Sequence, residues 1–433
     1  SIMNKKLWKN KKTFTSEKIT NFLSKDDVKL DNELFLYDIK ATKAHIKGLK
    51  KINIISHAEY TDLNKQLNLL SKDFKNKKFK LDSKYEDGHS AIEIYLTKHL
   101  GDVGAKVHTG RSRNDQVQVA LRLYSKEMLK KINKINLKIN GVLIQKAKKT
   151  SSIKVPGYTH IQKATPSTWG LWFGSFAESF NDNILIIDQT IKWINSNPLG
   201  GAAGYGVNLP LDREFSAKEL GFERIQINSL YTQNSRGKYE LQIISALKQC
   251  LLDIRKFSWD LSLYLSQEFD YLDIGDDFKT GSSIMPNKNN PDVVEILRAN
   301  YSILCGCYSE LETLLSLPSG YHRDLQLSKK SLIEAFQVSI QTLDIFLALI
   351  KTIKINKIKS ESAIDKEMMM TNQVYGLVSK GIPFRDAYHM IKNNEVDVST
   401  NDSFENFSYG SPFNLAIEDI ESRFIELKKL ILS

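Results

Sequence analysis

Hydrophobic residues recur three or four positions apart over five long stretches in the middle of the chain. Within residues 238–274 this spacing, typical of one face of an α-helix, is followed by Leu241, Ile244, Leu247, Leu251 and Ile254. The same pattern holds in residues 114–140, 166–195, 292–317 and 325–354. The apolar stripes are wide, so each helix is expected to be buried on much of its surface. Five such helices predict an all-α fold built around a central bundle.

Between these stretches the signals for regular structure are weaker. Residues 152–161 are expected to form a loop or a short extended piece. Residues 197–212 form a glycine-rich loop that lacks the strand and βαβ context of a dinucleotide site. From about residue 362 the pattern predicts shorter helices. We therefore predict an N-terminal helical domain (1–110), a central domain of long helices (111–361) and a small C-terminal helical domain (362–433).

Composition narrows the class of protein. The chain is 41% hydrophobic and 26% charged, as in ordinary globular proteins. We expect no membrane span, because no apolar run approaches the ~18 residues that a span needs. The N-terminal sequence is basic without the apolar stretch of a secretory signal, which predicts a cytoplasmic protein. Three cysteines argue against a disulfide framework, and we expect no metal site at Cys305 and Cys307.

The formal net charge of +11 is compatible with binding either nucleic acid or an acidic small molecule. The lysines are spread along the chain among isoleucine and asparagine, as on a solvated surface. The sequence carries no RRM, KH or zinc-finger signature. We therefore expect no nucleic-acid partner.

Three loops between the long stretches hold the residues suited to chemistry: "HTGRSRNDQ" (108–116), "GYTHIQKATP" (157–166) and "GSSIMPNKNNP" (281–291). In the first, Arg111 and Arg113 flank Ser112, and arginine forks bind carboxylates or phosphates in a bidentate way. The alternative is a basic loop in which Asn114 and Asp115 cap the helix that follows.

The second and third loops also allow two interpretations each. His160, beside Thr159, is either structural or a general acid or base whose pKa lies near neutrality. In the third loop Asn290 can be an ordinary N-cap and Pro291 the first residue of the helix that follows. Alternatively Lys288, the serine hydroxyls and backbone N–H groups form an anion site at a helix N-terminus.

Taken together, the three loops resemble the signature motifs of the fumarase/aspartase superfamily. The Ser-Arg-Asn-Asp-Gln block in the first loop is similar to that of the argininosuccinate lyases, whereas fumarases typically have Ser-Ser-Asn-Asp there. Other similar stretches are "YEDGHSAIE", "NPLGG", "YHRDLQLSKK" and "KGIPFRDAY". The resemblance extends from about residue 30 to beyond residue 390.

The resemblance implies a reversible β-elimination of argininosuccinate to L-arginine and fumarate, as in arginine biosynthesis, without a cofactor or metal. It also implies an all-α fold and a homotetramer with a twenty-helix core. Each active site would then be shared between three subunits, with a different one of the three loops from each.

The resemblance also implies roles for individual residues. Ser282 would take the Cβ proton, Lys288 would stabilise the resulting anion, and His160, oriented by Glu295, would handle the second proton. The reverse assignment, with His160 as the base and Ser282 as the proton donor, stays open. The residues implied to line the substrate site are Ser112, Arg113, Asn114, Thr159, Asn290, Tyr321, Gln326, Lys329 and His89. His89 can equally be an ordinary histidine at a helix start.

The sequence also departs from the family pattern. Residues 6–14, "KLWKNKKTF", lack the usual glycines and arginine, and Thr165 stands where glutamine is usual. Residues 21–31 read "NFLSKDDVKLD" where many family members have Phe-Asn-Ala-Ser, and Asp26 or Asp27 is a candidate to replace that serine and meet the substrate α-ammonium.

Three rival interpretations are another superfamily lyase (adenylosuccinate lyase, aspartase or fumarase), a structural protein like the lens delta-crystallins, and a nucleic-acid-binding helical protein. The Arg-Asn-Asp-Gln block argues against the first. The presence of Ser282, Lys288, His160 and Glu295 argues against the second, and only charge favours the third.

Overall fold

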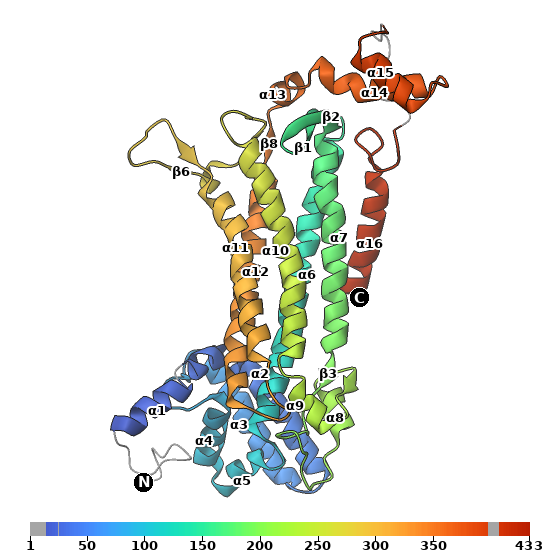
Figure 1. The fold of residues 1–433 in the computed structure, drawn as a ribbon. Helices are drawn as coiled ribbons and strands as arrows, with labels where there is room; N and C mark the ends of the chain where they lie inside the picture. The colour runs from blue at the N-terminus through green and yellow to red at the C-terminus, as the bar shows by residue number, and fades with distance from the viewer. Residues whose placement is uncertain (1–13, 25, 397–406) are drawn as a thin grey trace. The chain divides into compact units, whose positions relative to one another are not determined.

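Five long helices dominate the computed structural model, which describes residues 14–24, 26–396 and 407–433 (Figure 1). They are α6 (Arg113–Lys149), α7 (Trp169–Ile194), α10 (Lys238–Tyr264), α11 (Asp292–Leu314) and α12 (Ser328–Thr352). The hydrophobic pattern predicted all five, and the all-α class is confirmed. The departure "KLWKNKKTF" lies outside the described residues except for Phe14, at which α1 begins.

One helix ends earlier than its apolar pattern. The pattern continues to residue 274, but α10 ends at Tyr264. Beyond it the Ser266 hydroxyl accepts a hydrogen bond from the Phe269 N–H (3.2 Å), and Asp270 has a φ of 52°. This turn reverses the chain into β5 (Leu272–Asp273), which pairs with β8 (Lys354–Ile355). A local side-chain-to-backbone bond therefore ends a helix that apolar spacing alone would extend.

The chain comprises two compact units. Unit 1 comprises residues 1–131, 189–247 and 304–337, and unit 2 comprises 132–188, 248–303 and 338–433. The domain boundaries predicted at residues 110 and 361 divide the chain into consecutive segments, whereas each unit combines three separate segments. These boundaries remain a prediction.

Unit 1 is built on α2 (Asp27–Lys51), α3 (His57–Lys75) and α4 (Gly88–Leu100). Leu63, Leu67 and Leu70 on one face of α3 are fully buried in a core shared with α2 and α4. Ser56 caps α3 by accepting from the Glu59 N–H (3.1 Å), and Asp87 caps α4 by accepting from the Ser90 N–H (2.6 Å). The remaining elements are α1 (Phe14–Ser24), α5 (Asp102–Ala105), η1 (Lys106–His108), α8 (Arg213–Glu219), α9 (Ser229–Asn234), η3 (Arg323–Leu327) and the short parallel pair β3 (Ser196–Asn197) and β4 (Arg224–Ile225).

Unit 2 carries two antiparallel hairpins that hold predicted site residues. β1 (Lys154–Thr159) pairs with β2 (Gln162–Thr168), and β6 (Thr280–Gly281) pairs with β7 (Asn289–Asn290). Residues 152–161 were expected to form a loop or a short extended piece, and they supply one strand of the longer hairpin. The remaining elements are η2 (Asp276–Phe278), α13 (Lys357–Ser362), η4 (Lys366–Met369), α14 (Met370–Val378), α15 (Phe384–Lys392) and α16 (Ile417–Leu432).

One continuous helical stretch, Arg323–Thr352, is long and apolar enough to cross a membrane by length and composition. The sequence pattern had suggested no such stretch. Half of its most apolar window is buried inside the protein, as in the core helix of a globular domain.

Candidate active site

Seven of the predicted site residues line one cavity of unit 1, with a volume of about 400 Å³. They come from the start of α4, the start of α6, and the segment that leads into α12. These segments are far apart in sequence, so the fold brings the predicted binding residues together. The seven are His89, Ser112, Arg113, Asn114, Tyr321, Gln326 and Lys329.

The turn before α6 is held by reciprocal side-chain-to-backbone bonds. The Asn114 N–H donates to Ser112 Oγ (3.2 Å), and the Ser112 N–H donates to Asp115 Oδ1 (2.9 Å). Ser112 is therefore the N-cap, and Asp115 in the first turn completes a capping box with it, so the predicted capping role fits Asp115 but not Asn114. Buried Asp115 also accepts from the N–H groups of Gly200 (3.1 Å) and Ala202 (3.0 Å), which ties the glycine-rich loop to this turn.

The two arginines of this turn differ in their surroundings. Arg113 forms ion pairs with Glu86 (3.3 Å) and Asp87 (3.0 Å), and it donates to Ser90 Oγ (2.9 Å). Arg111 is buried and donates to Thr42 Oγ1 (2.9 Å). Both line the cavity, but Arg113 is partly exposed and better placed to bind a carboxylate that enters.

Lys329 is the centre of a buried ion-pair cluster. Its Nζ lies 2.8 Å from both Asp27 Oδ1 and Asp31 Oδ1, and Asp31 also accepts from the Gly88 N–H (2.8 Å). Burial disfavours the charged ammonium, but Asp31 and Asp27 outweigh it and raise the pKa of Lys329. Of the two aspartates that are candidates to replace the family's serine, Asp27 lines the cavity, as does Ser24.

His89 forms a second buried pair, since its Nδ1 lies 2.5 Å from Asp38 Oδ2. The two side chains are 10% and 3% exposed. Their alignment is not that of a hydrogen bond, so the contact is primarily an ion pair. Burial lowers the pKa of His89, but Asp38 outweighs burial and raises it.

His160 stands at the tip of the β1–β2 hairpin in unit 2. Thr159 pairs with Gln162, so His160 and Ile161 form a two-residue turn with φ values of 55° and 58°. Such turns favour asparagine and glycine, and a β-branched residue with positive φ is unusual and strained. Both side chains are exposed. Strain at an exposed histidine is a reason to suspect function.

The loop 281–290 is closed at its base by the β6–β7 pairing. Thr280 pairs with Asn290 and Gly281 with Asn289. Ser282 therefore comes directly after one paired strand, and Lys288 comes directly before the other. The Ser282 Oγ accepts from the N–H groups of Ile284 (3.3 Å) and Met285 (3.0 Å). These donors favour the deprotonated form of the hydroxyl.

The helix after this loop begins at Asp292, so Asn290 serves as a strand residue and not as the helix cap. Thr280 Oγ1 hydrogen-bonds to Asp292 and ties the loop base to the helix start. Lys288 and Glu295 are both exposed. Within the described part of unit 2, no hydrogen bond or ion pair joins His160, Ser282 and Glu295 to one another.

Sequence reasoning overlooked several residues in the cavity wall, among them Arg236, which is almost fully buried. The signal available was an arginine directly before Gly237, at the start of a long helix. Among residues 14–24, 26–396 and 407–433, no group of three His, Cys, Asp or Glu side chains is arranged to hold a metal ion.

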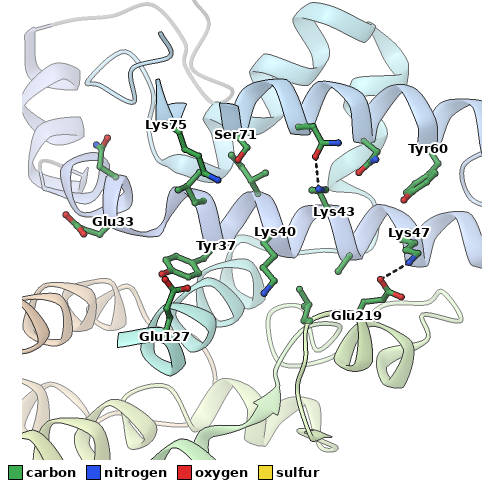
Figure 2. Close-up of a pocket in the computed structure, with 17 residues that line it drawn as sticks. Glu33, Tyr37, Lys40, Lys43, Lys47, Tyr60, Ser71, Lys75, Glu127 and Glu219 are labelled. Carbon is green, nitrogen blue, oxygen red and sulfur yellow. Dashed lines mark hydrogen bonds and ion pairs between the residues drawn. The ribbon is translucent and has the colours of Figure 1, made fainter. Parts of the chain in front are cut away.

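A larger hollow of unit 1, about 790 Å³, holds none of the predicted site residues (Figure 2). It is lined by Lys40, Lys43 and Lys47 of α2 and by Lys75 of α3. Lys43 donates to Asn68 Oδ1 (2.7 Å), and Lys47 pairs with Glu219 (2.8 Å). Half-exposed pairs of this kind are ordinary surface contacts. Size alone therefore does not identify the site, and the smaller cavity is the better candidate.

Similarity to known proteins identifies the family of the chain. Residues 11–305 match the family described as "Lyase". The chain is 48% identical to the argininosuccinate lyase of Xanthomonas euvesicatoria over 88% of both chains. It is also 48% identical to that of Xanthomonas campestris, over 88% of this chain and 89% of the relative.

Among solved structures, an EDDS lyase variant with bound fumarate superposes with a TM-score of 0.80. It covers 95% of this chain and 90% of the neighbour at 20% identity, which supports the fold alone. The family match and the extensive identity over nearly the whole length establish that the chain belongs to the argininosuccinate lyase family.

Proposed function

We propose that this chain catalyses the reversible β-elimination of argininosuccinate to L-arginine and fumarate. The observation that carries the proposal is the convergence of seven predicted binding residues on one cavity of unit 1. That cavity presents cationic side chains for carboxylates and acidic side chains for the ammonium and guanidinium groups. The relatives named argininosuccinate lyase support the same substrate.

The chemistry explains why these residue types are needed. The reaction breaks a C–H bond and a C–N bond and forms the double bond of fumarate. Removing the proton next to a carboxylate creates a doubly charged aci-carboxylate, which fixed donors must stabilise as the charge develops. Lys288 and the backbone N–H groups of loop 281–290 suit that task, and a loop closed over the substrate also excludes water.

Two proton transfers are assigned to two side chains. Ser282 takes the Cβ proton, helped by the N–H groups of Ile284 and Met285 that donate to its Oγ. His160, oriented by Glu295, delivers a proton to the departing guanidinium nitrogen. The opposite assignment uses the same residues with their roles exchanged. Thr159 and Asn290 are assigned, with Arg113 and Asn114, to the succinyl carboxylates.

We also propose a homotetramer in which each active site uses residues of three subunits. Two observations support this assembly. His160, Lys288 and Glu295 are exposed and make no hydrogen bond to one another in the described part of unit 2. In addition, α10 and α11 expose large apolar side chains in unit 2, namely Leu252, Trp259, Leu263, Ile296 and Ile303.

The assembly is tested by light scattering and by mixing two inactive variants. His160→Asn and Ser282→Ala proteins, mixed under conditions that exchange subunits, are expected to recover part of the activity. An active monomer, or no recovery after verified exchange, would refute the shared site.

The substrate is tested by following fumarate absorbance with four candidates side by side: argininosuccinate, adenylosuccinate, aspartate and malate. We expect fumarate from argininosuccinate only. Release from adenylosuccinate alone would move the chain to a sibling activity. A folded tetramer without turnover of any of the four would favour a structural, crystallin-like role.

A further inference from the structure

Loop 281–290 is closed by a side-chain bond that the mechanism above does not use. Thr280 lies directly before the loop, and Asp292 is the first residue of α11. The Thr280 hydroxyl donates a hydrogen bond to the Asp292 carboxylate. We call this pair the clasp. Both residues are exposed, so the bond contributes little to the stability of the core, and its effect falls on the loop that it closes.

The chain that leads into the loop is anchored before it reaches Thr280. β5 pairs with β8, and the Gly275 N–H donates to Thr352 Oγ1 (3.0 Å) at the end of α12. The Lys279 side chain is 20% exposed, and its Nζ lies 2.6 Å from Asp273 Oδ1. Thr280 is therefore presented at the end of a segment that backbone and side-chain bonds already hold.

The chain that leaves the loop is anchored by α11. Asp292 begins this helix, and Val294 in its first turn is fully buried. One turn further, Arg298 donates to Ser262 Oγ (2.8 Å) of α10. The clasp therefore joins two anchored elements of unit 2, and only the loop between them is left to move.

The clasp also closes the short hairpin from which the two functional side chains extend. β6 and β7 pair with Gly281 opposite Asn289. Ser282 comes directly after this residue pair and Lys288 directly before it, so the pairing sets the separation of their backbones. A ladder of two residue pairs is marginal by itself. The side-chain bond at its open end therefore helps to keep Ser282 and Lys288 together.

The charge of Asp292 favours a positional role over a direct one. Asp292 and Glu295 both lie in the first turn of α11, where carboxylates offset the positive end of the helix dipole. A carboxylate here repels the anion that forms when the Cβ proton leaves. Asp292 therefore does not assist that step by its charge, whereas its bond to Thr280 uses the carboxylate to fix the loop.

We propose that the clasp is a positioning device for catalysis, which holds loop 281–290 so that Ser282 and Lys288 act on the substrate together. The inference rests on the proposed function, because it uses the roles assigned there to these two residues. Thr280 and Asp292 act through the loop and are therefore positioning residues.

The test is a double-mutant cycle on the clasp. Thr280→Val removes the hydroxyl with little change in volume, Asp292→Ala removes the acceptor, and a third protein carries both changes. Thr280→Ser keeps the hydroxyl and is the conservative variant. The control is Asp277→Ala, which removes an acidic side chain from an exposed position of η2.

We expect Thr280→Val and Asp292→Ala each to lower kcat by about tenfold to a hundredfold, the usual effect of a small misplacement of catalytic groups. KM for argininosuccinate should change less, because the binding residues assigned in unit 1 are untouched. The double variant should be no worse than the poorer single variant, since both changes break the same bond. Thr280→Ser should recover most of the wild-type kcat, and the melting temperatures should stay almost unchanged.

Losses that multiply in the double variant would mean that the two residues act separately, and this result would overturn the inference. So would a kcat of Thr280→Val equal to that of Asp277→Ala, or a loss confined to KM.

Hydrogen exchange of the loop amides provides a measurement that needs no turnover. Breaking the clasp should speed exchange in the peptide that contains residues 281–290 by about fivefold, as expected for the loss of one ordinary hydrogen bond. A wild type that releases no fumarate from argininosuccinate would defeat the proposed function. The ordering of the loop by the clasp would still be decided by exchange, and an unchanged rate in Thr280→Val would overturn it.

Discussion

The cavity of unit 1 and the hairpins of unit 2 hold their polar side chains in opposite ways. In the cavity, Lys329 and His89 are buried and paired with aspartates at 2.8 and 2.5 Å. In the hairpins, His160 and Lys288 are exposed at the ends of short strands. The groups assigned to recognition are thus fixed within the fold. The groups assigned to proton transfer stand on exposed loops, and other residues must surround these groups to complete the site.

This difference has a measurable consequence. Removing one partner of a buried ion pair leaves an uncompensated charge, so changes in the cavity should lower stability as well as activity. Exposed loop residues contribute little to the core, so changes there should lower kcat and leave the melting temperature almost unchanged.

The largest expected effect is that of Lys329→Met. It leaves Asp27 and Asp31 buried together without their cation, which should cost about 3–5 kcal/mol of the free energy of unfolding. Urea denaturation measures this cost, and Lys330→Met, at the exposed neighbouring position, is the control. Equal stability of the two variants would mean that the ion-pair cluster does not support the fold.

Ser282→Ala should reduce kcat at least as much as the loss of Lys288, by about a thousandfold, because it removes the hydroxyl assigned to proton transfer. The matched variant Ser283→Ala, one residue further along the same loop, should be milder. Steady-state assays with thermal melts separate the two effects. Similar kcat values for the two variants would contradict the assignment of Ser282.

Lys288→Met should lower kcat by roughly a hundredfold to a thousandfold, equivalent to about 3–4 kcal/mol of transition-state stabilisation. An exposed lysine without such a role changes stability by only ~0.5 kcal/mol when it is replaced. Retention of more than about a tenth of the wild-type kcat would defeat the anion-site assignment, since one factor of ten is only ~1.4 kcal/mol.

The same contrast explains what the sequence could predict. The helix period identified all five long helices, because wide apolar stripes are a strong local signal. Motif resemblance identified seven of the residues that line the cavity. Apolar spacing could not anticipate that α10 ends at Tyr264, because that boundary depends on a serine bond and a positive φ. Arg236 was overlooked because its significance comes from burial and a missing partner, which only the fold reveals.

Buried histidines in unit 1 should make stability depend on pH with opposite signs. Burial and nearby Arg111 lower the pKa of His45 to about 3. The folded state therefore keeps this side chain neutral. As pH falls below about 6.5, the free energy of unfolding decreases by roughly 1.4 kcal/mol per pH unit. His89 has a raised pKa in the folded state. Its contribution to the free energy of unfolding is therefore fully present below about pH 6.5 and declines as pH rises through the pKa of the folded state.

Urea denaturation at pH 5.5, 7 and 8.5 tests both histidines. His45→Gln should lose less stability than the wild type between pH 7 and 5.5, by about 1 kcal/mol. The stability gap between the wild type and His89→Gln should be widest at pH 5.5 and narrow toward pH 8.5. Identical pH profiles for all three proteins would mean that these sites do not titrate differently on unfolding.

The smallest expected effect is that of Ile161→Gly at the hairpin tip. Ile161 has a φ of 58° and a largely exposed side chain, so glycine relieves strain and sacrifices little burial. Relief of about 1–2 kcal/mol is offset in part by the greater freedom of glycine in the unfolded chain. The free energy of unfolding should therefore rise by about 1 kcal/mol or less. Gln162→Gly, in the extended strand of the same hairpin, should lower it.

Activity of the Ile161→Gly variant then decides what the strain is for. A strained turn orients His160 outward, and a relaxed glycine allows the tip other conformations. If kcat falls while stability rises, the strain serves to position the proton-transfer group, as strained residues at active sites often do. If kcat is unchanged, the β1 and β2 strands alone orient His160. The backbone of the hairpin tip would then matter little for catalysis, and the tip would differ less from the fixed cavity.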